Sequence, residues 1–336
     1  MGKLATEELK KLLKCVRKDS RVVVPPMPGF DSGVHLVNGK YLVVSTDPCI
    51  GVPQKWFGWL LIHYAASDVA LFGAKPQFCT VNLLGPPSTK LETFYEVMEQ
   101  VCEAADELKM AVVTGHTGTY EGLLTLVGVC TAYGTVDKER LRTPAGAKPG
   151  DYILCTKAVG LEIAVNFALT HPPLAEKLLG TAKTKRLSEL VHMQSCVKEA
   201  LLLSEIEGVH AMHDATEGGL TAALNEMTEA SGVGFKIEFE KIPVNEEAQI
   251  LSRCFNIPDE QTLAMSSTGT IIAAVRPDAK DTVEEELRKN DVEASFLGIF
   301  TKNKQRILVK NGKEVSFPRR TEDPYEKIMA RKALTA

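Results

Sequence analysis

The sequence has little of several features that mark particular classes of protein. No stretch approaches the length of uninterrupted apolar residues that a membrane-spanning helix needs, and the N-terminal segment lacks the apolar centre of a signal peptide. The eight cysteines form no C-x-x-C pair, and several, such as Cys130, lie in apolar runs, which excludes a zinc-ribbon or disulfide scaffold. A net charge of -4 disfavours a nucleic-acid partner. We therefore expect a cytoplasmic protein with no membrane or nucleic-acid partner.

The length and the order of the patterns predict a two-domain α/β protein. The 336 residues exceed one ordinary hydrophobic core, and 44% hydrophobic with 24% charged residues is typical of globular chains. Segments with strand and helix patterns alternate, which indicates layered α/β domains. Proline and glycine cluster in "TPAGAKPGD", residues 143–151, just before a new strand pattern. We expect domains over residues 1–147 and 148–318, followed by a charged tail over 319–336.

Several local elements are strongly indicated. Asn38-Gly39 lies between two strand patterns in residues 34–47, which predicts a β-hairpin. Helical patterns cover residues 56–72 and 91–108, and a short apolar strand is expected at 209–212.

The segment "HDATEGGLTAALNE", residues 213–226, places two glycines at the start of an amphipathic helix pattern. Gly218 and Gly219 each disfavour a helix interior by roughly 1 kcal/mol relative to alanine. One explanation is structural: Asp214 and Glu217 have the spacing of a capping box, and glycine permits close packing. The other is functional, because bare amides at a helix N-terminus can hold a phosphate. The segment alone leaves both explanations open.

Three aspartates lie where oxygen ligands for a cation are expected. Asp68 lies inside an apolar helix pattern, Asp47 ends a strand of β-branched residues, and Asp31 precedes the hairpin. Carboxylates at strand ends suit Mg²⁺, which fills its remaining positions with water and phosphate oxygens. The structural alternatives are a paired or solvated Asp68 and a turn residue at Asp31.

A further small-residue loop follows the strand pattern in "VVTGHTGTYEG". Gly115 and Thr117 would let a phosphate approach the backbone there. His116 can ligate a metal, donate to a phosphate or complete a turn.

Four segments, "STDP", "SDVALFGAKP", "VTGHT" and "HDATEGGLTAALNE", together resemble the motifs of the AIR synthase-related (PurM-like) superfamily in order and spacing. That superfamily includes aminoimidazole ribonucleotide synthase, thiamine-monophosphate kinase, selenophosphate synthetase and the hydrogenase-maturation protein HypE. The last motif, with its "LNE", is most similar to HypE. The resemblance implies an N-terminal mixed sheet with helices that pairs in a homodimer, and a C-terminal α/β sandwich domain. It also implies ATP and Mg²⁺ as cofactors.

The resemblance assigns positions in each domain to this chemistry. Asp47 and Asp68 fall on metal- or phosphate-binding positions, and Asp31 falls on another metal position. The remaining cofactor-binding positions that it implies are Gly115, His116, Thr117, Asp214, Thr216, Gly218 and Gly219. The chemistry shared by such proteins is ATP-dependent activation of an oxygen, often an amide oxygen, as a phosphate ester.

Three departures from the HypE pattern stand out. The last cysteine is Cys254, so the chain is expected to lack the cysteine tail of HypE. His116 replaces the carboxylate of the G-[DE]-T loop, and Glu217 replaces an arginine before the double glycine. A carboxylate at that position would repel phosphate.

Three hypotheses follow. The first is an ATP- and Mg²⁺-dependent, HypE-like enzyme that acts on a small molecule or a protein-borne amide. The second, which His116 and Glu217 favour, is a non-catalytic nucleotide-binding or partner-binding paralogue. The third is a small-molecule kinase resembling thiamine-monophosphate kinase, which would leave the phosphate on its product.

Overall fold

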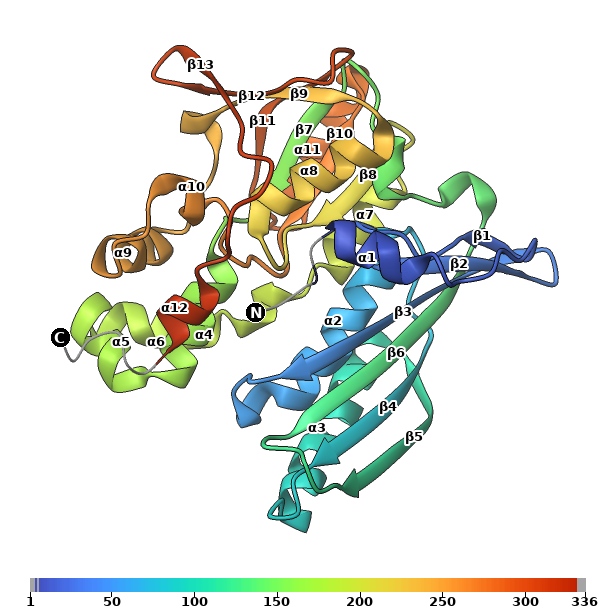
Figure 1. Ribbon diagram of the computed structural model, residues 1–336, viewed down its shortest axis with the longest axis vertical. Coiled ribbons are helices and arrows are strands. Elements are labelled where there is room, and N and C mark those ends of the chain that lie inside the picture. Colours follow the sequence, from blue (N-terminus) through green and yellow to red (C-terminus); the bar gives the residue numbers. More distant parts are fainter. Residues whose placement is uncertain (1–3, 5, 331–336) are drawn as a thin grey trace. The chain divides into compact units, whose positions relative to one another are not determined.

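The computed structural model describes Leu4 and residues 6–330, which form two compact units (Figure 1). The smaller unit comprises Lys10–Leu141, and the larger contains the chain from Arg142 onward. The last six residues of the expected tail lie outside the described residues. The prediction that the chain lacks the cysteine tail of HypE concerns this same end of the chain. The first helix is α1 (Thr6–Leu13). The two-sheet α/β architecture confirms the expected fold class.

The smaller unit is a six-stranded sheet in the order β1-β2-β3-β6-β4-β5. Its elements are β1 (Val22–Val24), β2 (Ser32–Val37), β3 (Lys40–Ile50), α2 (Phe57–Leu71), β4 (Phe78–Gly85), α3 (Leu91–Leu108), β5 (Ala111–Thr119) and β6 (Val127–Val136). Asn38 and Gly39 both have positive φ, 50° and 80°, so the expected hairpin joins β2 to β3 through a tight turn. Among the described strands of this unit, only β4 and β5 pair in parallel, and helix α3 connects them.

Helices α2 and α3 cover one face of this sheet (Figure 1). Helix α2 is apolar nearly all round, and almost all of its residues are buried. Buried and half-buried residues alternate along β6, as expected for a strand with one face in the core. The opposite face of the sheet is open within this unit.

The larger unit is a seven-stranded mixed sheet in the order β13-β12-β9-β11-β7-β10-β8. Its strands are β7 (Tyr152–Thr156), β8 (Val209–Asp214), β9 (Gly234–Glu238), β10 (Ile271–Val275), β11 (Ala294–Thr301), β12 (Arg306–Lys310) and β13 (Lys313–Ser316). Its helices are α4 (Leu161–Thr170), α5 (Pro172–Leu179), α6 (Thr181–Glu189), α7 (Val197–Ser204), α8 (Gly219–Ser231), α9 (Glu246–Cys254), α10 (Asp259–Thr262), α11 (Lys280–Lys289) and α12 (Tyr325–Met329). Leu220, Leu224 and Met227 of α8 pack into a core with Ile272 of β10.

The start of α8 corrects one expectation. The residue before the helix is Gly218, and no side chain caps it. Asp214 is still part of β8, where it pairs with Ile271 of β10. The proposed capping box of Asp214 and Glu217 is therefore wrong, because β8 extends to Asp214 and the helix begins only at Gly219.

The described part of the C-terminal segment packs on its own unit. Ile328 of α12 is buried. The Tyr325 hydroxyl lies 3.2 Å from Asn166 Nδ2 of α4, and the Met329 carbonyl lies 2.9 Å from His171 Nε2. The segment is therefore held on α4 along its described length.

Candidate functional site

In the smaller unit, Ser45 of β3 connects two of the predicted metal residues. Its hydroxyl lies 2.8 Å from the Asp68 carboxylate of α2 and 3.0 Å from the Asp31 carbonyl. Asp68 is 4% exposed, so its carboxylate is paired within the core, as the structural alternative required. Asp47 lies two residues after Ser45 on the same face of β3, about 7 Å along the strand.

A buried hydroxyl lies beside this group. Ser32 of β2 pairs with Ser45 across the two strands, so both side chains face the same side of the sheet. Ser32 is 2% exposed, and its Oγ has no hydrogen-bond partner in the described structure. A buried hydroxyl without a hydrogen-bond partner is uncommon, and it marks a position where a ligand that binds to oxygen atoms would fit.

The three predicted aspartates do not form one compact ligand set. Their carboxylates are not all within 4.8 Å of one another in the structure. Asp31 joins the group through its carbonyl, and Asp68 joins through its carboxylate. The donors are nonetheless all oxygens, which fits a hard cation such as Mg²⁺ rather than a thiophilic metal.

His116 faces the other side of the same sheet. His116 pairs with Asn82 of β4, and Asn82 pairs with Val129 of β6. Val129 in turn pairs with Pro48 of β3. Asp47, one residue earlier, pairs instead with buried Cys130. Because successive side chains of a strand alternate between faces, His116 and Asp47 lie on opposite faces. Sequence order alone gave no sign of this separation.

His116 lines a pocket of its own on the open face. The pocket is about 600 Å³ and is also lined by Asn82, Leu84, Tyr120 and Glu121. His116 Nε2 is hydrogen-bonded to the Tyr120 hydroxyl. Gly115 lies so close to β4 that a Cβ there would meet the Val81 carbonyl at 2.2 Å. The glycine of this segment is thus explained by strand packing.

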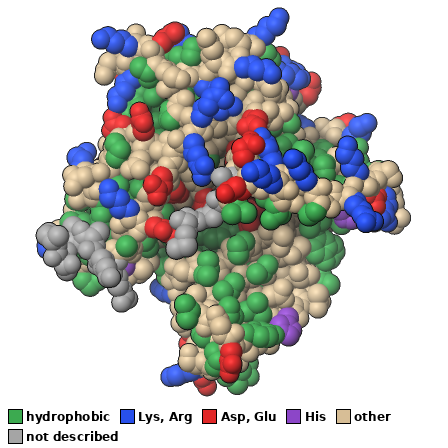
Figure 2. Space-filling model, viewed as in Figure 1, with side chains coloured by type: hydrophobic (Ala, Val, Ile, Leu, Met, Phe, Trp, Pro, Cys, Tyr) green, Lys and Arg blue, Asp and Glu red, His purple; other side chains and the backbone are tan. Residues whose placement is uncertain are grey.

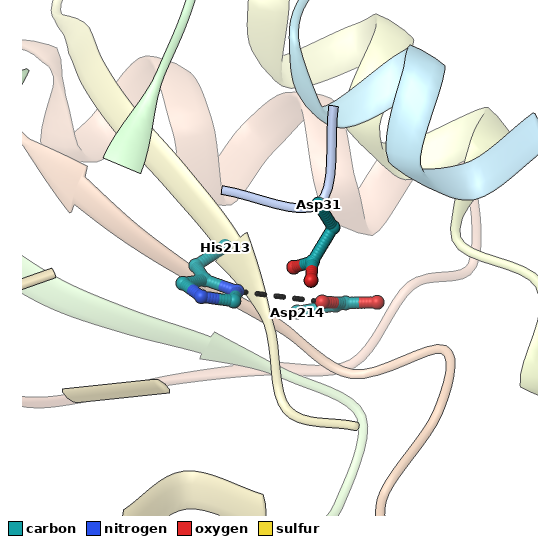
Figure 3. Close-up of side chains that lie close together, drawn as sticks. All are labelled: Asp31, His213 and Asp214. Atoms are coloured by element: carbon teal, nitrogen blue, oxygen red, sulfur yellow. Dashed lines mark hydrogen bonds and ion pairs between the residues drawn. The ribbon is translucent and has the colours of Figure 1, made fainter. Parts of the chain in front are cut away.

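In the larger unit, β8 ends on a buried histidine and aspartate (Figure 3). His213 Nδ1 lies 3.4 Å from Asp214 Oδ1, and its Nε2 lies 2.8 Å from Glu226 Oε2 of α8. His213 and Asp214 are each 3% exposed. Glu226 is the last letter of "LNE", so the two ends of the motif contact one another across the turn. His213 and Glu226 are candidate site residues that the sequence analysis did not assign.

The two glycines of the motif have different environments. Gly219 has φ +55°, and a Cβ on it would meet the Met265 carbonyl at 2.3 Å and the Leu263 carbonyl at 2.9 Å. Its amide donates to the Thr216 carbonyl at 2.9 Å. Close packing therefore accounts for Gly219, whereas Gly218, at φ +83°, directs its amide to a different acceptor.

The acceptor of the Gly218 amide is a carboxylate from the C-terminal segment. Asp323 Oδ2 lies 3.1 Å from the Gly218 nitrogen and also accepts the Ser266 hydroxyl. Asp323 Oδ1 accepts the Tyr325 amide at 2.9 Å. Burial raises the pKa of Asp323, although these hydrogen bonds oppose the rise. A carboxylate of the chain itself thus accepts the Gly218 amide at the helix N-terminus, and phosphate binding there stays a prediction.

A third carboxylate lies near this group. Burial raises the pKa of Glu162, at the start of α4, to about 7, and the charges of Asp323 and Glu217 contribute. The Thr268 amide and hydroxyl donate to Glu162 Oε2 at 3.1 and 2.7 Å. Glu217, which replaces the expected arginine, therefore adds to an acidic environment around the start of α8.

The two units define a class of protein: two mixed α/β sheets, with a buried carboxylate beside a strand in one unit and a glycine-rich strand-to-helix turn in the other. Models of the AIR synthase related protein family match both units, the N-terminal domain over residues 29–136 and the C-terminal domain over residues 148–310. The chain belongs to this family.

Several HypE proteins are similar to this chain. A putative hydrogenase expression/formation protein of Methanocaldococcus jannaschii is 25% identical over 83% of this chain and 82% of the relative. Carbamoyl dehydratase HypE of Cupriavidus necator is 31% identical over 61% of this chain and 58% of the relative. The solved structure of E. coli HypE has 23% identity and a TM-score of 0.73, over 85% of this chain and 88% of that one. A HypE solved in complex with ATP has 18% identity and a TM-score of 0.67, over 94% and 91%.

These comparisons confirm the family and the HypE-like fold expected from the four motifs. Among the described residues, no helix is long and apolar enough to cross a membrane.

Proposed function

We propose that this protein is an ATP- and Mg²⁺-dependent enzyme of the HypE type that activates an amide oxygen by phosphoryl transfer. The observation that carries the proposal is the oxygen-rich group in the smaller unit: Asp68 held by Ser45, Asp47 on the same strand face, and the orphaned Ser32 hydroxyl. The HypE relatives, one of them solved with ATP, support the nucleotide requirement.

The residues of each unit have separate roles in this proposal. Asp47 and Asp68, with Asp31 nearby, would hold Mg²⁺, which neutralises phosphate charge when bound. Ser45 orients the Asp68 carboxylate by donating a hydrogen bond to it. In the larger unit, the turn from Asp214 through Thr216 to Gly218 would contact a phosphate group, and the Gly218 amide would do so only in place of its hydrogen bond to Asp323.

The reaction has two steps. The amide oxygen of a small-molecule or protein-borne substrate attacks the terminal phosphorus of ATP, and ADP leaves. The amide nitrogen loses one proton as the imidate phosphate ester forms, and loss of the phosphate together with the second proton of that nitrogen completes a dehydration to a nitrile. Positioning and charge neutralisation supply most of the acceleration in such transfers.

Calorimetric titration with ATP, with and without Mg²⁺, tests the proposal. Wild type should bind ATP more tightly with Mg²⁺, and Asp47→Asn and Asp68→Asn should lose that dependence. Asp137→Asn is the matched control, because Asp137 is an exposed carboxylate of the same unit. Binding that ignores Mg²⁺ in all four proteins, or no binding in any, would overturn the metal role and favour a non-catalytic paralogue.

The fate of the phosphate separates the enzyme from a kinase. After incubation with ATP and a carbamoylated thiol, a dehydratase releases inorganic phosphate and ADP. A kinase of the thiamine-monophosphate type leaves the phosphate on its acceptor. Phosphate recovered on the acceptor would contradict the proposed dehydration.

We further propose that the protein is a homodimer formed through the open sheet face of the smaller unit. Figure 2 shows hydrophobic side chains gathered over β3–β6 on this face. Phe78, stacked on Tyr133, is 41% exposed, and β5 is an edge strand exposed along most of its length. Large exposed apolar patches and free strand edges mark interaction surfaces.

Light scattering at micromolar concentration tests this dimer. Phe78→Lys should convert the dimer to a monomer. Leu36→Lys should not, although Leu36 of β2 is equally exposed at 42%. A monomeric wild type would refute the proposal.

A further inference from the structure

A lysine, a histidine and an aspartate of the larger unit form a short hydrogen-bonded chain beside the start of β7. Lys148 Nζ lies 3.4 Å from His210 Nε2. His210 Nδ1 lies 2.9 Å from Asp151 Oδ2 and 3.1 Å from Asp151 Oδ1. Because an ionised carboxylate only accepts hydrogen bonds, this network assigns the proton of the neutral imidazole to Nδ1. The lone pair of Nε2 then faces the lysine nitrogen.

A tight turn fixes the position of the lysine. Pro149 and Gly150 are its central residues, and Gly150 has φ +96°, which suits the third position of a type II turn. The Asp151 amide donates to the Lys148 carbonyl at 3.1 Å, and the Lys148 amide donates to Asp151 Oδ2 at 2.8 Å. The carboxylate that contacts His210 therefore also holds the backbone of the lysine.

The histidine lies at an irregular point of β8. Between Val209 and Ala211 the register of β8 against β10 shifts, so that His210 is an extra residue in the strand. Such β-bulges redirect a side chain and are frequent beside active sites. A Cβ on Gly146, two residues before Lys148, would meet the His210 carbonyl at 2.0 Å. The segment that carries the lysine is therefore packed directly on the bulge.

Exposure to solvent increases from the aspartate to the lysine. The side chains of Asp151 and His210 are 4% and 14% exposed, whereas Lys148 is an exposed residue. A buried carboxylate that orients a histidine, whose other nitrogen contacts a nucleophile, is the arrangement found in nucleophilic catalytic triads. The amine is thus the end of the chain that a small molecule can reach.

We propose that Lys148 is an activated nucleophile that takes an acyl group from a small donor with an activated carbonyl, either an acyl phosphate or a thioester. His210 is its proton acceptor, and Asp151 is a positioning residue that acts through His210. This modification site shares no residue with the proposed phosphoryl-transfer site, so it goes beyond the proposed function.

The proposed step converts the lysine amine to an amide. His210 Nε2 takes one proton from the Lys148 ammonium, which frees the lone pair of the nitrogen. The nitrogen attacks the carbonyl carbon, and a C–N bond forms. The C–O bond to phosphate, or the C–S bond to the thiol, breaks, and the leaving group keeps the electron pair. A second proton of the nitrogen passes to water.

The test incubates the full-length protein, without ATP, with acetyl phosphate in one arm and acetyl-coenzyme A in the other. Mass spectrometry of peptides follows acetylation of each lysine over time. Lys302, an exposed lysine of the same unit, is the internal control. Lys148 should be acetylated about 10²-fold faster than Lys302 by at least one donor, which is the low end of what a positioned proton acceptor contributes. Comparable rates at the two lysines with both donors would overturn the proposal.

Two variants separate proton transfer from a merely structural role. His210→Asn keeps a donor toward Asp151 but has no nitrogen that accepts a proton. Asp151→Asn keeps an acceptor for the Lys148 amide, but its own amide donates to Nδ1 and so places the imidazole proton on Nε2. In both variants the acetylation rate of Lys148 should fall to that of Lys302. Hydrogen exchange of the Lys148 amide in Asp151→Asn should stay as in wild type, because the turn is retained.

Asp281→Asn is the matched control for the change of charge, since Asp281 is an exposed carboxylate of the same unit. It should leave the preference for Lys148 unchanged. A preference that persists in His210→Asn and Asp151→Asn would reduce the hydrogen-bonded chain to a structural clasp and overturn the proposal. If His210→Asn does not fold, Asp151→Asn and the comparison of the two lysines in wild type decide. The assay contains no ATP, so its result is independent of the proposed phosphoryl transfer.

Discussion

Replacing Gly219 by alanine tests why a double glycine precedes α8. A Cβ at Gly219 would lie 2.3 Å from the Met265 carbonyl and 2.9 Å from the Leu263 carbonyl. Both are backbone atoms, so no side chain can rotate away to make room. The residue also has φ +55°, in the left-handed region.

Gly232, which ends the same helix, is the matched control. It has φ +69°, and a Cβ there would meet nothing within 4 Å. Gly232→Ala should therefore reduce the free energy of unfolding by the left-handed strain alone, about 1 kcal/mol. Gly219→Ala adds a forced backbone shift of about 1–3 kcal/mol, for a total of about 2–4 kcal/mol.

Native-state hydrogen exchange of the β8 and β10 amides measures this stability in the larger unit. Tryptophan fluorescence cannot, because both tryptophans, Trp56 and Trp59, lie in the smaller unit. The exchange of the α2 amides provides an internal reference. If Gly219→Ala destabilised β8 no more than Gly232→Ala, the close approach to residues 263–265 would not be the reason for the glycine.

Three further predictions concern buried polar groups. Lys157→Met should lower the free energy of unfolding by about 3–5 kcal/mol, because it leaves Glu199, now 2.6 Å from Lys157 Nζ, as an unpaired buried charge. The double variant with Glu199→Leu should recover much of this free energy in urea unfolding. No recovery would refute the pairing argument. Ser45→Ala should lower the free energy of unfolding by about 1–3 kcal/mol, because it removes a hydrogen-bond donor to buried Asp68. Hydrogen exchange of the β3 amides measures this change, and Thr46→Ala on the exposed face is the control. The pKa of Glu162 is raised from 4.5 to about 7 in the folded state, so between these pH values folded Glu162 keeps a proton that the unfolded chain has lost. The free energy of unfolding should therefore fall by up to about 3 kcal/mol as the pH rises from 4.5 to 7. Glu162→Gln should flatten this dependence in urea unfolding measured at each pH. An equally steep slope in Glu162→Gln would contradict that assignment.

Local elements of this protein could be predicted from short windows of sequence. Asn38-Gly39 specifies its hairpin because both residues accept positive φ, and the apolar run of residues 57–71 forms a buried helix. The four motifs identified the family because their order along the chain is a property of the sequence. Asp68 was expected to be paired or to bind a cation because an isolated buried carboxylate is unstable.

Which residues meet was decided by register and packing between distant segments. His116 and Asp47 lie on opposite faces because each strand's register sets the parity of its side chains, and a shift of one residue would reverse it. Gly219 is required by the backbone of residues 263–265, and the Gly218 amide is bound by Asp323 from the end of the described chain. The sequence by itself determined the elements, the family and the donors available. Only the tertiary structure decided which donors face which acceptors, because those contacts depend on the docking of segments that lie far apart in the chain.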